Sequence, residues 1–194
     1  MFVTFEGLDG SGKTTQAKLL AEWLAHEGRE VVATREPGGT ALGERIREVL
    51  LHGEELSPWA EAALFAAARA ELVAQVIRPA LERGAAVVCD RYIDSSLAYQ
   101  GIARGLGIDP VLQLNLTVVG GLLPYKTFVL LLEPAEAARR KRRARDRIER
   151  EGETFHASLD AAYRQLADIY PERIVALDGS LSKMNLAEQV RAAL

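Results

Sequence analysis

Residues 5–16 read FEGLDGSGKTTQ, and the spacing of their glycines is the strongest indication of the fold. Gly7 to Thr14 fit the pattern G-x-x-x-x-G-K-[ST], a loop whose backbone N–H groups hold the phosphates of a nucleoside triphosphate. An apolar strand at 2–6 precedes the loop, and a helix beginning near residue 13 follows it. This placement directs a helix N-terminus at anionic oxygens, as the mechanism requires, and so argues against a chance match.

Each part of this phosphate loop has an expected task. The glycines permit backbone angles and close approaches that side chains would block. We expect Lys13 to reach the β- and γ-phosphates and the Thr14 hydroxyl to help hold Mg²⁺. The predicted ATP-binding residues of the loop are Gly7, Leu8, Asp9, Gly10, Ser11, Gly12, Lys13, Thr14 and Thr15.

Short apolar runs alternate with helical patterns along the rest of the chain. The predicted strands are 2–6, 30–34, 85–89, 127–132 and 173–177, and their nearly continuous hydrophobicity is typical of strands covered on both faces. Helices are predicted near 13–27, 41–51, 58–82, 94–100, 110–119, 134–150, 154–170 and 185–193, with Ser57-Pro58 and Asp109-Pro110 as helix starts. We therefore predict one domain, 1–194, with an α/β three-layer fold and a parallel sheet of about five strands.

Composition restricts the possible partners and compartment. The formal net charge of −3 gives the whole molecule no general attraction for nucleic acid or acidic membranes, and we expect neither as a partner. The single cysteine, Cys89, excludes an internal disulfide and fits a reducing compartment. Without a basic N-terminal region or a long apolar run, the chain is expected to be cytoplasmic. His26, His52 and His156 are scattered and suggest no metal site.

One segment departs from this charge balance. Between Arg139 and Arg150 lie eight basic and two acidic residues, a local formal charge of +6. From charge alone, this segment is a solvated helix face, an arm for nucleic acid, or a device for anionic ligands.

The stretch VVCDRY ends a predicted buried strand on Asp90. A carboxylate at that place is expected beside the phosphate loop, facing the Mg²⁺ site. The alternative is a structural ion pair between Asp90 and Arg91.

Three further stretches indicate the acceptor of the phosphoryl group. TREPGGT (34–40), LFAAARAEL (64–72) and DRYIDSSLAYQG (90–101) occur in the order seen in thymidylate kinases, and DRIEREG (146–152) follows as in the bacterial type. With the phosphate loop, the chain resembles this family of P-loop nucleoside monophosphate kinases from residue 2 to about 178. The resemblance implies transfer of the γ-phosphoryl group of Mg·ATP to dTMP, giving dTDP and ADP in the dTTP synthesis pathway. It also implies a helical lid at about 138–152 and a homodimer.

The resemblance assigns the substrate-binding residues. The acceptor phosphate is assigned to Arg35 and Arg91, and Arg45 is expected to join them from the next helix. Pro37 is assigned to the same site, and the sequence leaves open whether the bond before it is cis or trans. Several cations are needed there because the acceptor dianion approaches the phosphates of ATP. Arg35 alone would read as an ordinary surface arginine.

For the nucleoside, the resemblance assigns Phe65 to stacking on the base and Arg69 to the carbonyl O4 of thymine. Taken alone, Phe65 would more often be a core residue, whereas a charge on the alanine-rich stretch around Arg69 is harder to place in a core. Ser96 and Gln100 fall at positions that meet the base edge. The remaining assignments are Tyr99, which crowds a ribose 2′-hydroxyl, and Asp9, which lies near the sugar 3′-hydroxyl.

The arginine-rich segment resembles the lid that supplies catalytic arginines in the bacterial type. Arg143, Arg145 and Arg147 are expected near the transferring group, and Arg139 or Arg140 on the adenine. The predicted catalytic residues outside the lid are Asp9, Lys13, Asp90 and Arg91. The segment departs from the family in being short and dense in arginine, and Tyr125 replaces the usual acidic residue before the fourth strand.

Two other functions remain open from the sequence. One is a deoxynucleoside kinase or another nucleoside monophosphate kinase of similar fold. The other is a P-loop switch protein, although the stretches suited to a second phosphate and a base argue against it.

Overall fold

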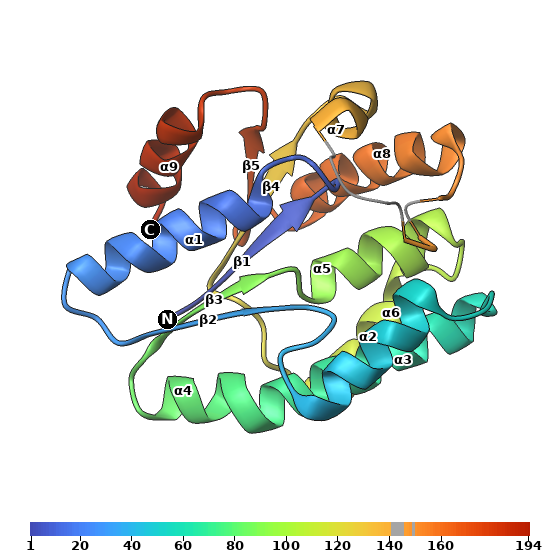
Figure 1. The fold of residues 1–194 in the computed structure, drawn as a ribbon, viewed down its shortest axis with the longest axis horizontal. Coiled ribbons are helices and arrows are strands. Elements are labelled where there is room, and N and C mark those ends of the chain that lie inside the picture. Colours follow the sequence, from blue (N-terminus) through green and yellow to red (C-terminus); the bar gives the residue numbers. More distant parts are fainter. Residues whose placement is uncertain (141–145, 149) are drawn as a thin grey trace.

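A computed structural model describes residues 1–140, 146–148 and 150–194 of the chain. Within these residues, five parallel strands form one sheet in the order β2-β3-β1-β4-β5 (Figure 1). The strands are β1 (Phe2–Gly7), β2 (Val31–Arg35), β3 (Ala86–Asp90), β4 (Lys126–Leu131) and β5 (Ile174–Asp178). Each bound lies within one residue of its predicted position, and the predicted fold class is confirmed.

Helices cover both faces of this sheet. They are α1 (Lys13–His26), α2 (Ala41–His52), α3 (Pro58–Leu72), α4 (Arg78–Glu82), α5 (Ile93–Ser96), α6 (Ile108–Val119), α7 (Pro134–Arg140), α8 (Glu153–Ile169) and α9 (Lys183–Ala192). Two π-helical segments, η1 (Val73–Ile77) and η2 (Leu97–Ala103), continue α3 and α5. Among the described residues, no helix is long and apolar enough to cross a bilayer.

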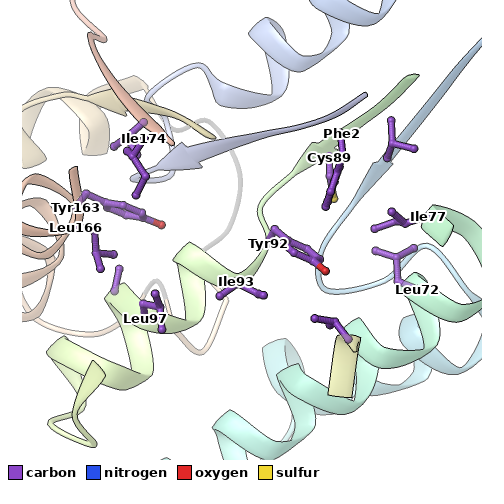
Figure 2. Packing of buried hydrophobic residues seen from close by; sticks show 14 of the residues in the cluster. Phe2, Leu72, Ile77, Cys89, Tyr92, Ile93, Leu97, Tyr163, Leu166 and Ile174 are labelled. Carbon is purple, nitrogen blue, oxygen red and sulfur yellow. The ribbon is translucent and has the colours of Figure 1, made fainter. Parts of the chain in front are cut away.

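The two layers of helices follow from the alternation of strand side chains. Val3 and Phe5 of β1 point to one face, where they pack with α1 and α9, while Phe2 points to the other. On that second face the sheet packs against α3, η1, η2 and α8. Figure 2 shows this packing, with Phe2 and Cys89 of the sheet lying beside Tyr92, and Tyr163 coming from α8. Both faces are therefore buried, as the continuous hydrophobicity of the strands predicts.

Helix ends confirm one predicted start and correct another. The Ser57 hydroxyl accepts a hydrogen bond from the Ala60 N–H and caps α3 as predicted. The prediction that Asp109 caps α6 is wrong, because α6 begins at Ile108 and Gly107 occupies the cap position with φ 88°. Pro110 still lies in the first turn, where its missing N–H leaves no intrahelical bond unmade.

The predicted helix at 134–150 is wrong at residues 146–148 and 150, the part of its second half that the structure describes. Helix α7 ends at Arg140, and residues 146–148 and 150 are not helical. The Arg147 N–H donates to the Leu51 carbonyl of α2, 2.9 Å away, instead of to a carbonyl one turn back. Contact with α2 therefore overrides the local helical pattern at this point.

Candidate active site

A cavity of about 250 Å³ lies where the carboxyl ends of β1, β2 and β3 meet, the usual place for a ligand in an open parallel sheet. It brings together residues far apart in the sequence. Its lining consists of Asp9, Lys13, Thr14, Arg35, Glu36, Pro37, Arg47, Leu51, Phe65, Asp90, Arg91, Ser95, Ser96, Tyr99, Gln100, Asp146 and Ile148.

The phosphate loop has the tight backbone that its glycines predict. Gly7 has φ 133°, and a Cβ there would lie 2.5 Å from the Leu130 carbonyl oxygen. Gly10 has φ 92°, and its Cβ would lie 2.3 Å from the Ala137 carbonyl oxygen of α7. These positions exclude every residue with a side chain unless β4 or α7 moves.

Lys13 is buried at the start of α1, and its Nζ lies 2.7 Å from Asp9 Oδ1. Burial and the nearby Arg91 lower the pKa of Lys13, whereas Asp9 and Asp90 oppose that change. The ammonium group is thus held at the loop by the carboxylate of Asp9, which the sequence also assigned to the site.

Thr14 and Asp90 form the predicted pair for Mg²⁺. Thr14 Oγ1 donates to Asp90 Oδ2 at 2.5 Å. The second oxygen, Asp90 Oδ1, is buried and has no hydrogen-bond partner in the part of the chain that the structure describes. An orphaned carboxylate oxygen beside a hydroxyl fits Mg²⁺, which takes oxygen ligands and usually few from the protein.

Arg91 is the centre of the charged network between the loop and η2. It has φ 73°, an uncommon angle for a residue with a side chain, directly after β3. Its Nη2 lies 2.6 Å from Asp9 Oδ1, and its Nη1 donates to Ser95 Oγ and Tyr163 Oη. Burial alone would lower the pKa of Arg91, but Tyr99 and Asp9 raise it overall, so the guanidinium remains charged.

Glu6 is a buried carboxylate beneath this network that sequence patterns did not single out. It accepts hydrogen bonds from the Tyr92 N–H at 2.7 Å, from Ser95 Oγ at 2.5 Å and from Tyr163 Oη at 3.1 Å. Burial raises the pKa of Glu6 to about 7, against the opposing effect of Arg91. The one available signal was an acidic residue in a strand whose other residues are uncharged.

The arginines at the other end of the cavity come from β2 and α2. Arg35 is half exposed and pairs with Glu44 at 3.0 Å, and the Glu36–Pro37 peptide bond is cis. The placement of Arg45 beside the acceptor is not supported, because Arg45 is exposed and Arg47 lines the cavity instead. Arg47 lies one turn after the buried Gly43 and so faces inward, where its Nη1 donates to the Pro37 carbonyl.

Phe65, Ser96, Tyr99 and Gln100 all line the cavity as predicted. Arg69 lies behind this wall and is only 1% exposed.

All three guanidinium nitrogens of Arg69 face partners within the protein. Nε donates to Glu36 Oε2 at 2.8 Å, and Nη2 donates to the Tyr92 carbonyl and approaches the same Glu36 oxygen at 2.6 Å. Nη1 donates to Ser96 Oγ at 2.9 Å and to the Asn115 side chain. Glu36 and Ser96, which Arg69 contacts, line the cavity, whereas Arg69 itself does not. Its predicted bond to thymine O4 stays a prediction and requires one of these bonds to open.

The structure describes only some of the arginines that the sequence analysis assigned to the lid and the adenine. Arg143 and Arg145 lie outside the described residues. Arg147 is directed away from the expected phosphoryl position, because its Nη2 lies 2.7 Å from Glu61 and its Nε donates to the Leu50 carbonyl. Arg139 is exposed and pairs with Glu136 on α7.

Comparisons with known proteins agree with this geometry. The family model described as thymidylate kinase matches residues 5–190. A thymidylate kinase of Synechococcus sp. (strain JA-3-3Ab) is 50% identical over 98% of this chain and 93% of its own length, and one of Pelotomaculum thermopropionicum is 52% identical over 92% and 85%. The crystal structure of thymidylate kinase from Ehrlichia chaffeensis superposes with a TM-score of 0.81 at 34% identity, covering 100% of this chain and 98% of that one. The chain therefore belongs to the thymidylate kinase family.

Proposed function

We propose that this chain transfers the γ-phosphoryl group of ATP to dTMP, giving dTDP and ADP, in the cavity described above. The main support for this proposal is that a donor-phosphate site and a second group of cations line one cavity. Lys13 and Thr14 of the phosphate loop line the same space as a second set of cations, Arg35, Arg47 and Arg91. A protein that only hydrolyses a nucleotide has no need of the second set.

The donor phosphates are assigned to the phosphate loop and Lys13. Thr14 and Asp90 would hold Mg²⁺ there. When bound, this ion neutralises charge on the β- and γ-phosphate oxygens. Lys13 is held in place by Asp9, and its ammonium group would stabilise the negative charge that develops on the transferring phosphoryl group.

The acceptor phosphate is assigned to Arg35, Arg47 and Arg91. A phosphate dianion that approaches ATP is repelled by it, and guanidinium groups with fork geometry offset that repulsion. The acceptor oxygen is already ionised near neutral pH, so a strong general base is unnecessary. Direct in-line transfer by positioning and charge stabilisation, without a covalent enzyme intermediate, is the mechanism that these residues support.

The nucleoside is assigned to the wall formed by α3 and η2. Phe65 supplies an aromatic face for the base, and Ser96 and Gln100 supply polar groups for its edge. Tyr99 of η2 and Asp9 of the phosphate loop both accept hydrogen bonds from Arg91 Nη2 and line the cavity, and they are assigned to the sugar of the acceptor.

We further propose a lid at about 138–152, a homodimer and a cytoplasmic location, all on the resemblance to the family. The lid proposal is supported by Asp146 and Ile148, which line the cavity. Exposed apolar residues on α2 and α3, among them Val49 and Trp59, support association of two copies. Sedimentation equilibrium of the wild type and of a Trp59→Glu variant would test the dimer.

The decisive experiment is detection of dTDP by ³¹P NMR after incubation with dTMP and Mg·ATP, with Lys13→Ala as the control. Testing a panel of nucleosides and nucleoside monophosphates as acceptors distinguishes a thymidylate kinase from a nucleoside kinase. Because a pocket discriminates one methyl group only about 10- to 200-fold, dUMP should be a poor but measurable substrate, and dCMP nearly inert. Hydrolysis of ATP with no phosphorylated acceptor would refute the proposal in favour of a switch protein.

A further inference from the structure

Glu61 on α3 is a buried carboxylate next to the base wall that has no task in the mechanism above. It is 1% exposed. Its Oε1 accepts from Gln100 Nε2 at 2.9 Å and from Arg104 Nε at 3.3 Å. Its Oε2 accepts from Arg147 Nη2 at 2.7 Å and from Arg104 Nη2 at 3.3 Å. Two guanidinium groups therefore hold this carboxylate in place, and a neutral amide completes its hydrogen bonding.

These contacts fix which end of the Gln100 amide meets the cavity. An ionised carboxylate only accepts hydrogen bonds, so the amide group facing Glu61 must be the NH₂. Burial alone would raise the pKa of Glu61, but hydrogen bonds from Gln100, Arg147 and Arg104 lower it overall, so the carboxylate is ionised. Gln100 lines the cavity, and its amide oxygen is the polar atom left to face a ligand there.

We propose that Glu61 is a positioning residue for base selection. By holding the Gln100 amide oxygen toward the cavity, it makes the site accept a pyrimidine that presents an N–H and reject one that presents a bare ring nitrogen. Thymine carries N3–H, whereas N3 of cytosine is an acceptor. This inference rests on the proposed function, since it takes the cavity as the place of the acceptor base.

The substitution Glu61→Gln tests this role because it replaces one carboxylate oxygen by an NH₂ group. On the Oε2 side that NH₂ would face the guanidinium groups of Arg104 and Arg147. On the Oε1 side it would face only the 3.3 Å contact from Arg104 Nε, and it can donate to Gln100 provided that the Gln100 amide turns over. The variant is therefore expected to present the Gln100 NH₂ to the cavity, where it opposes the thymine N–H and matches the cytosine nitrogen.

The experiment measures kcat/KM for dTMP and for dCMP with Mg·ATP in the wild type, Glu61→Gln and Glu82→Gln. Glu82 is an exposed residue at the end of the same continuous helix and serves as the matched control. We expect the dTMP-to-dCMP ratio to fall roughly 10- to 100-fold in Glu61→Gln, the effect of one mispaired buried group, and to stay unchanged in Glu82→Gln. Equal losses for both substrates would indicate a merely structural role and overturn the inference.

A second measurement, hydrogen exchange in the wild type, needs neither the Glu61→Gln variant nor a substrate. The side-chain NH₂ signal of Gln100, assigned by its loss in Gln100→Leu, should exchange with water far more slowly than that of the exposed Gln165. Exchange as fast as that of Gln165 would overturn the bond to Glu61 on its own. Failure of the wild type to make dTDP would refute the proposed function while leaving this bond independently tested.

Discussion

Arg69 offers the sharpest test of how a buried charge supports the site. All three of its guanidinium nitrogens face protein acceptors, and its main partner, Glu36, is buried with Oε1 lacking a hydrogen-bond partner among the described residues. In Arg69→Met the Glu36 carboxylate would lose the cation that compensates its burial. Removing one member of a buried pair typically costs about 3–5 kcal/mol, so we expect the free energy of unfolding to fall by that amount.

The pH dependence of this loss has a definite sign. Burial raises the pKa of Glu36 even with Arg69 present, and removing the guanidinium raises it further. A carboxyl group with a raised folded-state pKa keeps its proton on folding at low pH and loses that stabilisation as the pH rises. Arg69→Met should therefore be less destabilised at pH 5.5 than at pH 8.

Urea unfolding followed by circular dichroism measures this effect, with Arg83→Met as the matched control. Arg83 pairs with Glu30 at 2.7 Å, but both side chains are about half exposed, and such a pair contributes only about 0–1 kcal/mol. The double variant Arg69→Met/Glu36→Gln should be more stable than the sum of the single losses, because no carboxylate is then left uncompensated. A loss below about 1 kcal/mol in Arg69→Met, or strict additivity of the two substitutions, would show that Glu36 does not depend on Arg69 for its charge compensation.

Three further predictions concern the floor of the site. Glu6→Gln should remove a pH dependence of stability, because the pKa of Glu6 is about 7 in the folded protein and 4.5 ordinarily. As the pH rises from 4.5 to 7, the free energy of unfolding of the wild type should fall by about 3 kcal/mol relative to that of the variant. Parallel curves of stability against pH for the two proteins would contradict this. Asp90→Asn should raise the Mg²⁺ concentration needed for half-maximal rate about 10- to 100-fold, and an unchanged Mg²⁺ titration would remove Asp90 from the metal site. Gly10→Ala should weaken ATP binding measured by calorimetry, because its Cβ would lie 2.3 Å from the Ala137 carbonyl and α7 must move. Gly28→Ala, with φ 79° and open space around its Cβ, isolates backbone strain as the control; equal ATP affinities in the two variants would refute the steric argument.

Local patterns in the sequence predicted much of the architecture. The phosphate loop, the five strands and their alternation with helices depend on residues near one another in the chain, and the structure confirms them. The placement of Phe65, Tyr99 and Gln100 around one cavity also agrees with the assignments made from family motifs.

Predictions failed where a distant contact decides the conformation. The predicted helix does not continue to residue 147 because Arg147 bonds to Leu50 of α2 and to Glu61, which lie 97 and 86 positions earlier. Arg45 and Arg47 both follow the same motif, and only the packing of α2 shows that Arg47 faces the cavity.

Short stretches of the chain are enough to predict the fold class and the position of the phosphate loop, because strand periodicity and glycine conformations are properties of local backbone. The hydrogen-bond partners of Arg69, Glu6 and Glu61 become known only once the chain is folded. A buried charge is stabilised by whichever groups the fold brings against it, and those groups come from separate elements that no local pattern connects.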